Sequence, residues 1–367
     1  MKVLTILGTR PEIIRLSRII PVLDRHADHV VVHTGQNYDP TLSDIFFEQL
    51  TVRAPDRYLG VSGGGFANQA AEIIARVDGE IERASPDRIV ILGDTNSGLA
   101  AIAAARRGIP VYHLEAGNRC YDDRVPEEVN RRIIDHCSAV LMPYTHRSKE
   151  NLLREGIEAE RIFVTGNPIG EVLAENESRI AASTALADLS LDPGGYFLVT
   201  LHRAENVDEP ARLTEILAGL DAISREHGRP VIVSLHPRTA DRISRGGITV
   251  DSDRIRLLRP FGFFDFVALE RSAFCVITDS GTVQEECAIL RVPNVTIRDV
   301  TERPETIEAG SNMLAGANSD DLRRAVGLVI ALTRDWPLPL EYTLTKVSMT
   351  IAKIVLGFRW DPKRARR

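Results

Sequence analysis

The chain has 367 residues, a formal net charge of -6 at pH 7, and 44% hydrophobic and 26% charged residues. This balance fits a globular protein with two domains of ordinary size, and the acidic charge argues against a nucleic-acid partner. With no apolar run of membrane-spanning length and no signal peptide, we expect no membrane partner and a cytoplasmic protein. The four cysteines have no paired spacing, which favours neither a zinc site nor a disulfide framework.

Short apolar runs alternate with amphipathic stretches along the chain, the pattern of parallel sheets covered by helices. The first series of predicted strands comprises residues 3–7, 30–33, 88–92, 111–114, 139–142 and 162–164. Predicted helices among them include residues 12–23, 66–81 and 97–106. The second series comprises residues 196–201, 231–235, 255–258, 275–278 and 295–297. We therefore predict an α/β protein with two Rossmann-like, doubly wound domains that face one another across a cleft.

Turn residues separate the two series of strands. Thr-Gly-Asn-Pro at 165–168 ends the first series, and Pro-Gly-Gly at 193–195 precedes the second. We place the first domain at 1–168 and the second at 169–349, and we expect a C-terminal helix at about 350–367 to pack back on the first. Ligands of such sheets bind at the carboxyl ends of the strands, so functional residues are expected there.

Basic residues follow the first predicted strand. Gly-Thr-Arg-Pro-Glu occupies 8–12, and Pro11 suits the first position of a helix. Arg10 and Arg15 then lie near the start of this helix, where they can hold a phosphate. They can equally be surface arginines at a turn, which is common.

Three acidic residues gather at the strand ends of the first domain. Asp94 and Glu115 follow predicted strands, and Glu127 lies in the first turn of a predicted helix. Carboxylates collected at one edge of a sheet can divide acid and base roles between them. Structural alternatives remain for two of them: Asp94 can cap the next helix, and Glu127 can simply favour a helix N-terminus. Glu115 interrupts the end of an apolar strand and is harder to explain structurally.

Two histidines follow strands of the second domain. His202 is accompanied by Arg203, Glu205 and Asn206, and His236 ends the next strand. Such a histidine can titrate near neutral pH or contact a pyrophosphate. A lone histidine is more often structural, but the polar residues crowded around His202 favour a functional role.

The segment 279–282, Asp-Ser-Gly-Thr, joins a predicted strand to a predicted helix. The N–H groups at a helix start attract phosphate, and Glu286, just inside the helix, can accept hydrogen bonds from ribose hydroxyls. Without a lysine after the glycine this is no P-loop, and neither 8–10 nor 63–65 has dinucleotide-fingerprint spacing. We interpret it as a site for a nucleotide-sugar diphosphate; the alternative is a helix capped by Ser280. The acids and histidines show no metal-ligand spacing, so we expect neither a metal nor another cofactor.

Together these motifs resemble the non-hydrolysing UDP-N-acetylglucosamine 2-epimerase family. The resemblance covers nearly the whole chain in collinear order, through segments 8–12, 93–95, 115–117, 126–131, 164–167, 202–206, 279–286 and 301–305. It implies a glycosyltransferase-B-like fold, a UDP-sugar substrate and no cofactor. We also expect a homodimer.

The resemblance implies that carbon 2 of the sugar is inverted through elimination and re-addition of UDP, with a 2-acetamidoglucal intermediate. Asp94, Glu115 and Glu127 would be the acid/base groups, and His202 a catalytic histidine. The implied contacts to the nucleotide sugar are Arg10, Arg15, His202, His236, Phe261, Ser280, Gly281, Thr282, Glu286 and Arg303.

Two departures from the family pattern concern basic side chains. Arg15 stands where the family usually has a lysine. Gln36 and Asn37 stand where it has a Gln-His pair, which contacts a second, activating substrate molecule in many bacterial members. We therefore treat Gln36 and Asn37 as an effector site that responds weakly or not at all.

Other departures concern the sugar. Segments 15–18, 94–97 and 117–120 resemble a branch of the family whose substrate is a UDP-2-acetamido-2,6-dideoxy-L-hexose. This sugar is therefore an alternative to UDP-N-acetylglucosamine. A hydrolysing relative, a glycosyltransferase-B-type transferase and a non-enzymatic nucleotide-sugar sensor are further alternatives; the three acids argue against the last two.

Overall fold

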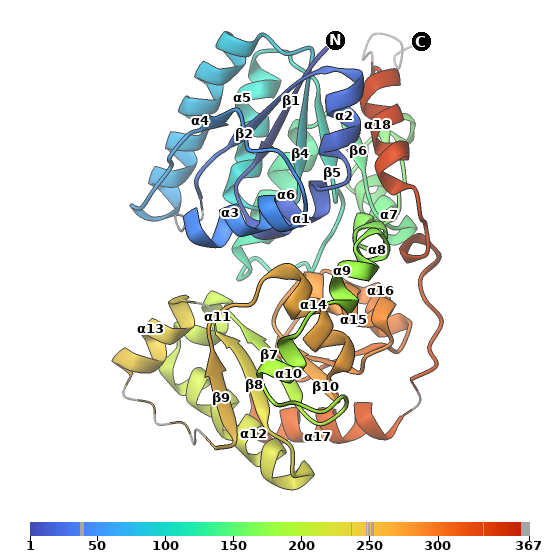
Figure 1. Cartoon of the computed structure of the whole chain (residues 1–367). Helices are drawn as coiled ribbons and strands as arrows, with labels where there is room; N and C mark the ends of the chain where they lie inside the picture. Colours follow the sequence, from blue (N-terminus) through green and yellow to red (C-terminus); the bar gives the residue numbers. More distant parts are fainter. Residues whose placement is uncertain are drawn as a thin grey trace. The chain divides into compact units, whose positions relative to one another are not determined.

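The computed structural model describes residues 1–36, 40–235, 237–246, 248, 250, 253–332 and 334–360. The chain forms two units (Figure 1): one comprises Met1–Ala174 with the described part of Leu340–Arg367, and the other Glu175–Pro339. The domain limits expected from the sequence, at 168 and 349, stay predictions. His236 and Asn37, both expected at functional sites, lie outside the described residues.

The first unit is built on a six-stranded parallel sheet with the strand order β3-β2-β1-β4-β5-β6. Its strands are β1 (Lys2–Leu7), β2 (Asp28–His33), β3 (Arg57–Tyr58), β4 (Arg88–Leu92), β5 (Val111–Leu114) and β6 (Val140–Met142). The order reverses between β1 and β4, and doubly wound sheets bind ligands beside such a reversal.

Helices connect the strands of the first unit. They are α1 (Arg10–Leu16), α2 (Ile20–His26), α3 (Pro40–Gln49), α4 (Gly65–Ala84), α5 (Ala100–Arg106), α6 (Pro126–Cys137), α7 (His146–Arg154), α8 (Pro168–Glu175) and α18 (Val347–Gly357), with 3-10 helices η1 (Asn96–Leu99), η2 (Ala159–Arg161) and η3 (Leu340–Tyr342). Ile73, Val77 and Ile81 recur every four residues along α4, and all three are buried in one core with Leu4 and Ile6 of β1. Helical spacing thus places one apolar stripe of α4 on the sheet.

The second unit repeats this plan with the strand order β12-β11-β10-β7-β8-β9, again all parallel. Its strands are β7 (Phe197–Leu201), β8 (Val231–Leu235), β9 (Ile255–Leu258), β10 (Cys275–Thr278), β11 (Asn294–Thr296) and β12 (Asn312–Leu314). Its helices are α9 (Glu177–Ala181), α10 (Ala185–Asp188), α11 (Ala204–Val207), α12 (Pro210–His227), α13 (Pro237–Arg245), α14 (Phe263–Ser272), α15 (Gly281–Leu290), α16 (Pro304–Glu308) and α17 (Ser319–Ala331).

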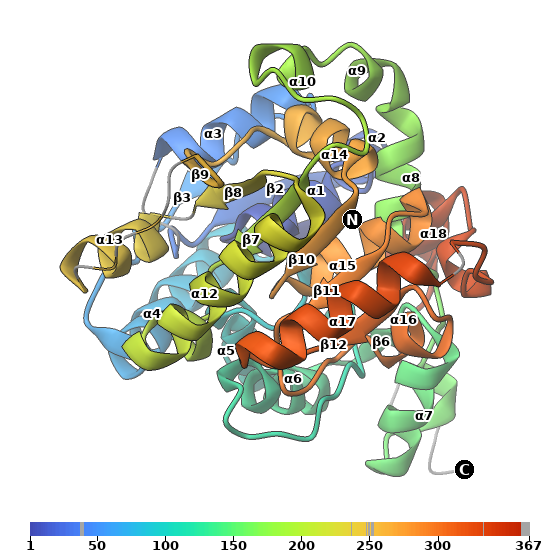
Figure 2. The same cartoon turned by 90° about the horizontal axis from the view of Figure 1, so that it is seen from below.

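Alternation along β7 shows that both faces of the second sheet are covered. Phe197 and Val199 belong to one buried core, and Leu198 belongs to another. Side chains of successive strand residues point to opposite faces, so two cores on one strand mean two covering layers. Helices α12 and α17 lie side by side against the first of these cores, as Figure 2 shows. The predicted doubly wound fold is confirmed for both units.

The C-terminal segment is tied to the first unit by hydrogen bonds at both ends of α18. The backbone N–H and the hydroxyl of Ser348 donate to Glu171, at 2.8 and 2.5 Å. At the other end, Arg88 donates to the carbonyl of Val355, and the Tyr112 hydroxyl donates to the carbonyl of Phe358 at 2.5 Å. Strands β4 and β5 thereby hold the end of a helix that lies more than 200 residues later in the chain.

Two sequence predictions of secondary structure were wrong, and two strands were missed. The strand predicted at 162–164 is a single bridge from Ile162 to Leu141, although the N–H groups of Phe163 and Thr165 donate to the carbonyls of Leu141 and Pro143. The helix predicted at 12–23 is split into α1 and α2, since Pro21 in the first turn of α2 cannot donate a backbone hydrogen bond. Strands β3 and β12 were missed because neither has an apolar run: the two residues of β3 are exposed, and β12 begins with Asn312.

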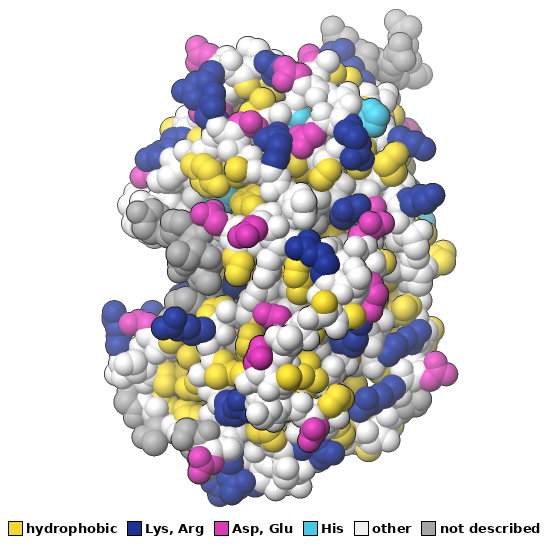
Figure 3. Space-filling view, in the orientation of Figure 1, with side chains coloured by type: hydrophobic (Ala, Val, Ile, Leu, Met, Phe, Trp, Pro, Cys, Tyr) yellow, Lys and Arg dark blue, Asp and Glu magenta, His cyan; other side chains and the backbone are white. Residues whose placement is uncertain are grey.

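Among the described residues, every helix is too short or too polar to cross a bilayer. Figure 3 shows one face of the molecule, on which basic and acidic side chains are interspersed. This mixture agrees with the modest net charge of -6.

Candidate active site

The acidic residues of the first unit lie at the carboxyl ends of neighbouring strands. Strands β4 and β5 pair in register, with Leu92 beside Leu114. Asp94 follows β4 by two residues, and Glu115 directly follows β5. The parallel topology therefore places both carboxylates at one edge of the sheet, as the sequence predicts.

Glu115 is buried and held by a backbone conformation that is uncommon for its type. Its φ is +65°, and its side chain is 6% exposed. The carboxylate forms an ion pair with Arg15 of α1, which is 3% exposed and stacks over the Tyr144 ring at 5.6 Å. A left-handed conformation costs a non-glycine residue about 1–3 kcal/mol, and such strain clusters at functional sites. Arg15 thus lies beside an acid, and its expected contact with a diphosphate stays a prediction.

Asp94 contacts an arginine of α6. Its Oδ2 lies 2.8 Å from Nε and 2.7 Å from Nη2 of Arg131, and the Asp94 side chain is 21% exposed. The residue at the N-cap of the following helix η1 is Thr95. The carboxylate of Asp94 is therefore bound to Arg131 rather than placed as the cap of that helix, which was the structural alternative.

The first turn of α6 carries two glutamates with different surroundings. Glu127 is partly buried, whereas Glu128 is 1% exposed and bonds both to α6 and to the loop before it. Sequence reasoning selected Glu127 and overlooked Glu128. The sequence signal that could have identified Glu128 is its spacing from Arg131. Residues at i and i+3 share one face of a helix and can form an ion pair.

A further carboxylate, which the sequence analysis did not select, connects the carboxyl ends of the central strands β1 and β4. Glu12 of α1 accepts hydrogen bonds from the N–H groups of Gly8 and Thr9, at 2.5 and 2.9 Å, and from the Thr95 hydroxyl at 2.5 Å. Burial raises the pKa of Glu12 to about 7 against these hydrogen bonds, and the charge of Asp94 adds to the rise. Glu12 therefore changes its ionisation near neutral pH.

A buried histidine supports the backbone beside both acids. His113 of β5 places Nε2 2.8 Å from the carbonyl oxygen of Gly93 and Nδ1 2.8 Å from Asp135. Asp135 also accepts from Gly117 N–H at 3.1 Å and pairs with Arg119 at 2.8 Å. Gly93 precedes Asp94 and Gly117 lies two residues after Glu115, so one buried cluster fixes both turns.

In the second unit, Asp279 organises the loop that carries His202. Asp279 is fully buried, and its Oδ2 accepts from the N–H groups of His202 and Arg203 at 2.9 and 2.8 Å and from Asn206 at 3.2 Å. Its Oδ1 lies 2.9 Å from His202 Nδ1. Burial alone would raise the pKa of Asp279, but His202 and these N–H donors hold it far below its usual range.

The start of α15 lies between β10 and a buried ion pair. Ser280 occupies the N-cap position, yet its hydroxyl makes no capping hydrogen bond, contrary to the structural alternative. A side chain at Gly281 would place its Cβ 2.6 Å from Glu302 Oε1, so any larger residue requires the Glu302 side chain to shift. Glu302 is 4% exposed and pairs with the buried Arg298 at 2.7 Å. Thr282 follows in the first turn and is partly buried.

Two of the other predicted contacts in this unit, Arg303 and Glu286, are buried, and the third, Phe261, is partly buried. Arg303 is 3% exposed and paired with the buried Glu285 of α15. Glu286 is also 3% exposed. Its charge affects Glu270 of α14: the burial of Glu270, together with the negative charge of Glu286, raises the pKa of Glu270 well above its usual range. Phe261 is partly buried against the core formed with Leu198.

Two predicted residues of the first unit remain. Burial lowers the pKa of Arg10, whose guanidinium lies 5.8 Å from the centre of the Phe46 ring. The Gln36 side-chain oxygen accepts from both the N–H and the hydroxyl of Ser97, each at 3.1 Å. Gln36 thus links β2 to the turn after β4. The described residues contain no group of three or more His, Cys, Asp or Glu side chains arranged to hold a metal ion.

Comparison with known proteins identifies relatives along nearly the whole chain. A family model described as UDP-N-acetylglucosamine 2-epimerase matches residues 22–355. A UDP-N-acetylglucosamine 2-epimerase of Methanocaldococcus jannaschii is 41% identical over 348 residues, which cover 92% of this chain and 95% of the relative. A UDP-2,3-diacetamido-2,3-dideoxy-D-glucuronate 2-epimerase of Pseudomonas aeruginosa is 37% identical over 324 residues, covering 87% and 90%.

Solved structures agree with these matches. The glycosyltransferase WaaG, at 13% identity and a TM-score of 0.61 over 98% of this chain, shares the fold alone, which is of the glycosyltransferase-B-like class. The M. jannaschii UDP-N-acetylglucosamine 2-epimerase, crystallised with UDP-N-acetylglucosamine and UDP, has a TM-score of 0.92 at 39% identity, covering 96% of this chain and 99% of that one. The chain belongs to the UDP-N-acetylglucosamine 2-epimerase family, and the resemblance drawn from its motifs is confirmed.

Proposed function

We propose that this protein interconverts UDP-N-acetylglucosamine and UDP-N-acetylmannosamine by inverting carbon 2, without a cofactor. The observation that carries the proposal is the pairing of Asp94 and Glu115 at adjacent strand ends, each carboxylate in contact with an arginine. A carboxylate paired with an arginine is held in its ionised form, which can accept a proton. Family membership supplies the reaction class.

The proposed reaction breaks two bonds and forms them again. A carboxylate takes the proton from carbon 2, the carbon 1–oxygen bond breaks, and its electron pair leaves with UDP. The product of this half-reaction is a 2-acetamidoglucal. UDP oxygen then attacks carbon 1 while an acid on the opposite face returns a proton to carbon 2. Two proton-transfer groups are needed, and Asp94, Glu115 and Glu127 are the proposed set.

We assign nucleotide binding to the second unit. The N–H groups at Gly281 and Thr282 would hold the diphosphate, with Ser280 beside them, because a helix start favours anions. Glu286 would accept hydrogen bonds from the ribose, and Arg303 would contact the sugar or diphosphate. The contact with Asp279 holds the His202 imidazole in place, where it would stabilise UDP as it leaves.

Contacts to the substrate from the first unit are also proposed. Arg10 is the candidate for a phosphate, since its burial leaves a cation with little water around it. Arg15 would act through Glu115, with which it pairs. A homodimer is proposed as the assembled form, to be checked by light scattering.

A second candidate substrate is a UDP-acetamido sugar other than UDP-N-acetylglucosamine. The P. aeruginosa relative at 37% identity is named for a different UDP-acetamido sugar, so family membership alone leaves the sugar open. Segments 15–18, 94–97 and 117–120 favour the UDP-2-acetamido-2,6-dideoxy-L-hexose as this alternative. Chemistry at carbon 2 would be the same with either sugar.

The test is to incubate the full-length protein with UDP-N-acetylglucosamine in heavy water containing EDTA and no nicotinamide cofactor. NMR should show deuterium at carbon 2 in both epimers. Release of free N-acetylmannosamine with UDP would identify a hydrolysing enzyme instead. No exchange with this sugar, but exchange with the 6-deoxy or the diacetamido sugar, would reassign the substrate; no exchange with any would refute the proposal.

A further inference from the structure

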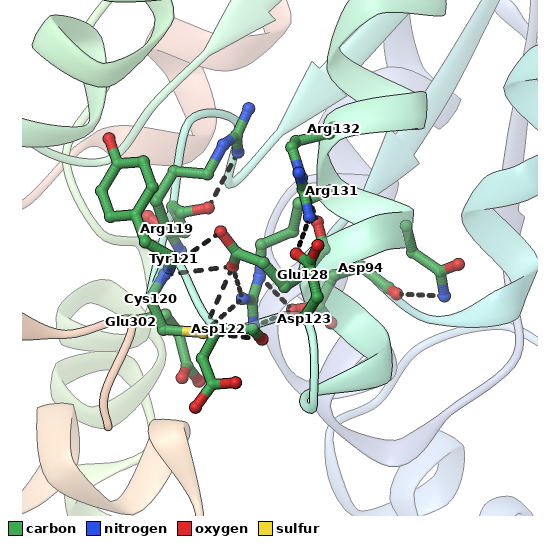
Figure 4. Close-up of polar contacts among 12 residues, drawn as sticks. Asp94, Arg119, Cys120, Tyr121, Asp122, Asp123, Glu128, Arg131, Arg132 and Glu302 are labelled. Carbon is green, nitrogen blue, oxygen red and sulfur yellow. Dashed lines mark hydrogen bonds and ion pairs between the residues drawn. The ribbon is translucent and has the colours of Figure 1, made fainter. Parts of the chain in front are cut away.

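The carboxylate of Glu128 is the centre of a cluster of polar contacts in the first unit (Figure 4). Its Oε1 accepts from Tyr121 N–H at 3.0 Å. Its Oε2 accepts from Cys120 N–H at 3.0 Å, from the Cys120 thiol at 3.3 Å and from Arg131 Nη1 at 2.6 Å. Both oxygens are therefore committed to donors within the protein.

Through Arg131, Glu128 is connected to a proposed catalytic acid. One guanidinium spans the two carboxylates: Nη1 faces Glu128, while Nε and Nη2 face Oδ2 of Asp94. Arg131 is 2% exposed, so water screens these interactions little. A fork of this shape is specific to arginine, because an ammonium group cannot meet two carboxylates in one plane.

Through the backbone of Cys120 and Tyr121, Glu128 also holds the loop that follows β5. Tyr121 has a φ of +55°, a left-handed conformation that a tyrosine adopts only when its surroundings impose it. The Tyr121 hydroxyl donates to Asn151 at 2.9 Å, and Asn151 donates to the carbonyl of Gly117 at 3.0 Å. The loop that begins at Glu115 is thus closed by contacts at both ends.

We propose that Glu128 is a positioning residue for the acid/base reaction: it orients Arg131 toward Asp94 and fixes the loop that follows Glu115. This inference rests on the proposed function of Asp94 and Glu115. Glu128 itself transfers no proton, because its oxygens are occupied. Burial would raise its pKa, but the N–H donors of Cys120 and Tyr121 and the charge of Arg131 lower it below the usual range, so it stays an anion.

The charge balance around Asp94 determines the consequence of removing Glu128. The charged groups that act on Asp94 include Arg131 with Glu128 behind it on α6, and Glu12 on α1. Glu128→Gln removes one negative charge beside Arg131 but keeps a side-chain oxygen that can accept its hydrogen bond. The pKa of Asp94 should then fall, because a nearby negative charge has been removed. Arg131→Lys leaves a cation that cannot span both carboxylates, so the pKa of Asp94 should rise.

The experiment measures these opposite shifts directly, on the full-length protein labelled with carbon-13 at aspartate carboxyl groups. The Asp94 signal is identified by its absence in Asp94→Asn and is titrated in the wild type, Glu128→Gln and Arg131→Lys. The controls are Glu150→Gln and Arg154→Lys, which alter an exposed Glu–Arg pair one turn apart in α7, with the charged atoms 3.7 Å apart. Neither control should move the Asp94 signal.

Shifts of opposite sign in the two variants support the proposal. An unchanged Asp94 pKa in either variant, with melting and circular dichroism showing a folded protein, overturns it, because a merely structural Glu128 would lower stability without altering the titration. If Glu128→Gln does not fold, Arg131→Lys alone decides: a raised pKa of Asp94 supports the proposal, and an unchanged pKa overturns it. The titration needs no substrate, so its outcome is separate from failure of the epimerase assay. Where turnover is present, the limb of the pH–kcat profile that reports Asp94 should move with the signal.

Discussion

Oδ1 of the fully buried Asp279 lies 2.9 Å from Nδ1 of His202, whose side chain is 40% exposed. The ring is thus anchored from the inside of the second unit and reaches the surface of that unit with its other edge. The same aspartate receives the backbone N–H groups of His202 and Arg203 through Oδ2. One carboxylate therefore fixes both the position of the imidazole ring and the backbone of the loop that carries it.

Replacing this carboxylate should give an acid-dependent loss of stability. Asp279→Asn keeps an acceptor but loses the charge, and hydrogen bonds to charged groups are worth about 1.5–3 kcal/mol. Because the folded-state pKa of Asp279 is depressed, its contribution is fully present above about pH 4, the usual aspartate pKa, and is lost as pH falls further. Denaturant melts of both proteins from pH 7 to pH 2.5 should show the difference shrinking. If the difference in unfolding free energy between the wild type and Asp279→Asn did not change with pH, the charge of Asp279 would not be the source of its stabilising effect.

Glu12 should show the opposite dependence on pH. Its folded-state pKa, about 7, lies above its usual 4.5, so the folded protein binds the proton more tightly and stability falls as pH rises from about 4.5 to 7. At 1.36 kcal/mol per unit the loss is about 3 kcal/mol. The free energy of unfolding of Glu12→Gln should depend less on pH over this range, and at pH 8 the variant should be at least as stable as the wild type. Glu150→Gln, in an exposed pair, is the control and should follow the wild type.

Neutral amides at the two strand-end acids should stop catalysis while leaving nucleotide binding in place. Asp94→Asn and Glu115→Gln should each lower kcat by about 100- to 10,000-fold, the usual contribution of a general acid or base. Protection of each variant by UDP against thermal unfolding should match that of the wild type. Near-normal turnover in either variant would remove that residue from the mechanism.

Glu286 is predicted to bind ribose, and a glutamine there separates this role from a structural one. A ligand at a hundred times its Kd stabilises by about 2.7 kcal/mol, and Glu286→Gln should reduce this protection by UDP. Without UDP the variant should be as stable as the wild type or more so, because the Glu286 charge raises the pKa of the buried Glu270. A large loss of stability without ligand would instead make Glu286 a core partner.

The last prediction concerns activation by substrate. The Gln36 oxygen already accepts two hydrogen bonds from Ser97, and Asn37 offers no cationic donor to an anionic effector. The missing charge-assisted bond is worth about 1.5–3 kcal/mol. We therefore expect a hyperbolic dependence of rate on UDP-N-acetylglucosamine concentration. A sigmoidal curve would contradict this expectation.

The fold followed from the sequence where apolar runs were long, and failed where pairing depended on a few backbone contacts. Strand β1 has four apolar residues among its six, whereas β3 is two exposed residues whose pairing depends on neighbouring β2. Motifs at strand ends predicted where Asp94 and Glu115 would gather. The partners of these acids came from distant segments: Arg15 lies a hundred residues before Glu115, and no local pattern announces such a pair.

Glu12 and Glu128 show why the supporting residues were missed. Each sits in the first turn of a helix, where a glutamate is ordinary because it suits the helix dipole. The Thr9–Glu12 spacing is a capping-box pattern, which predicts the bond from Glu12 to the Thr9 N–H. Only the folded chain reveals that both glutamates are buried and that Glu128 binds the N–H groups of the loop before α6. Burial of a helix-start glutamate depends on tertiary packing, which sequence spacing does not encode.

The return of the chain to its first unit through α18 determines which unit is completed first during synthesis. Residues 175–339 are an insertion in the polypeptide of the first unit, so the ribosome completes the second unit before α18 exists. Until then Arg88 and Tyr112 lack their acceptors at Val355 and Phe358. A nascent chain therefore holds an unfinished first unit throughout most of translation, and a stop codon anywhere before residue 347 leaves it permanently unfinished.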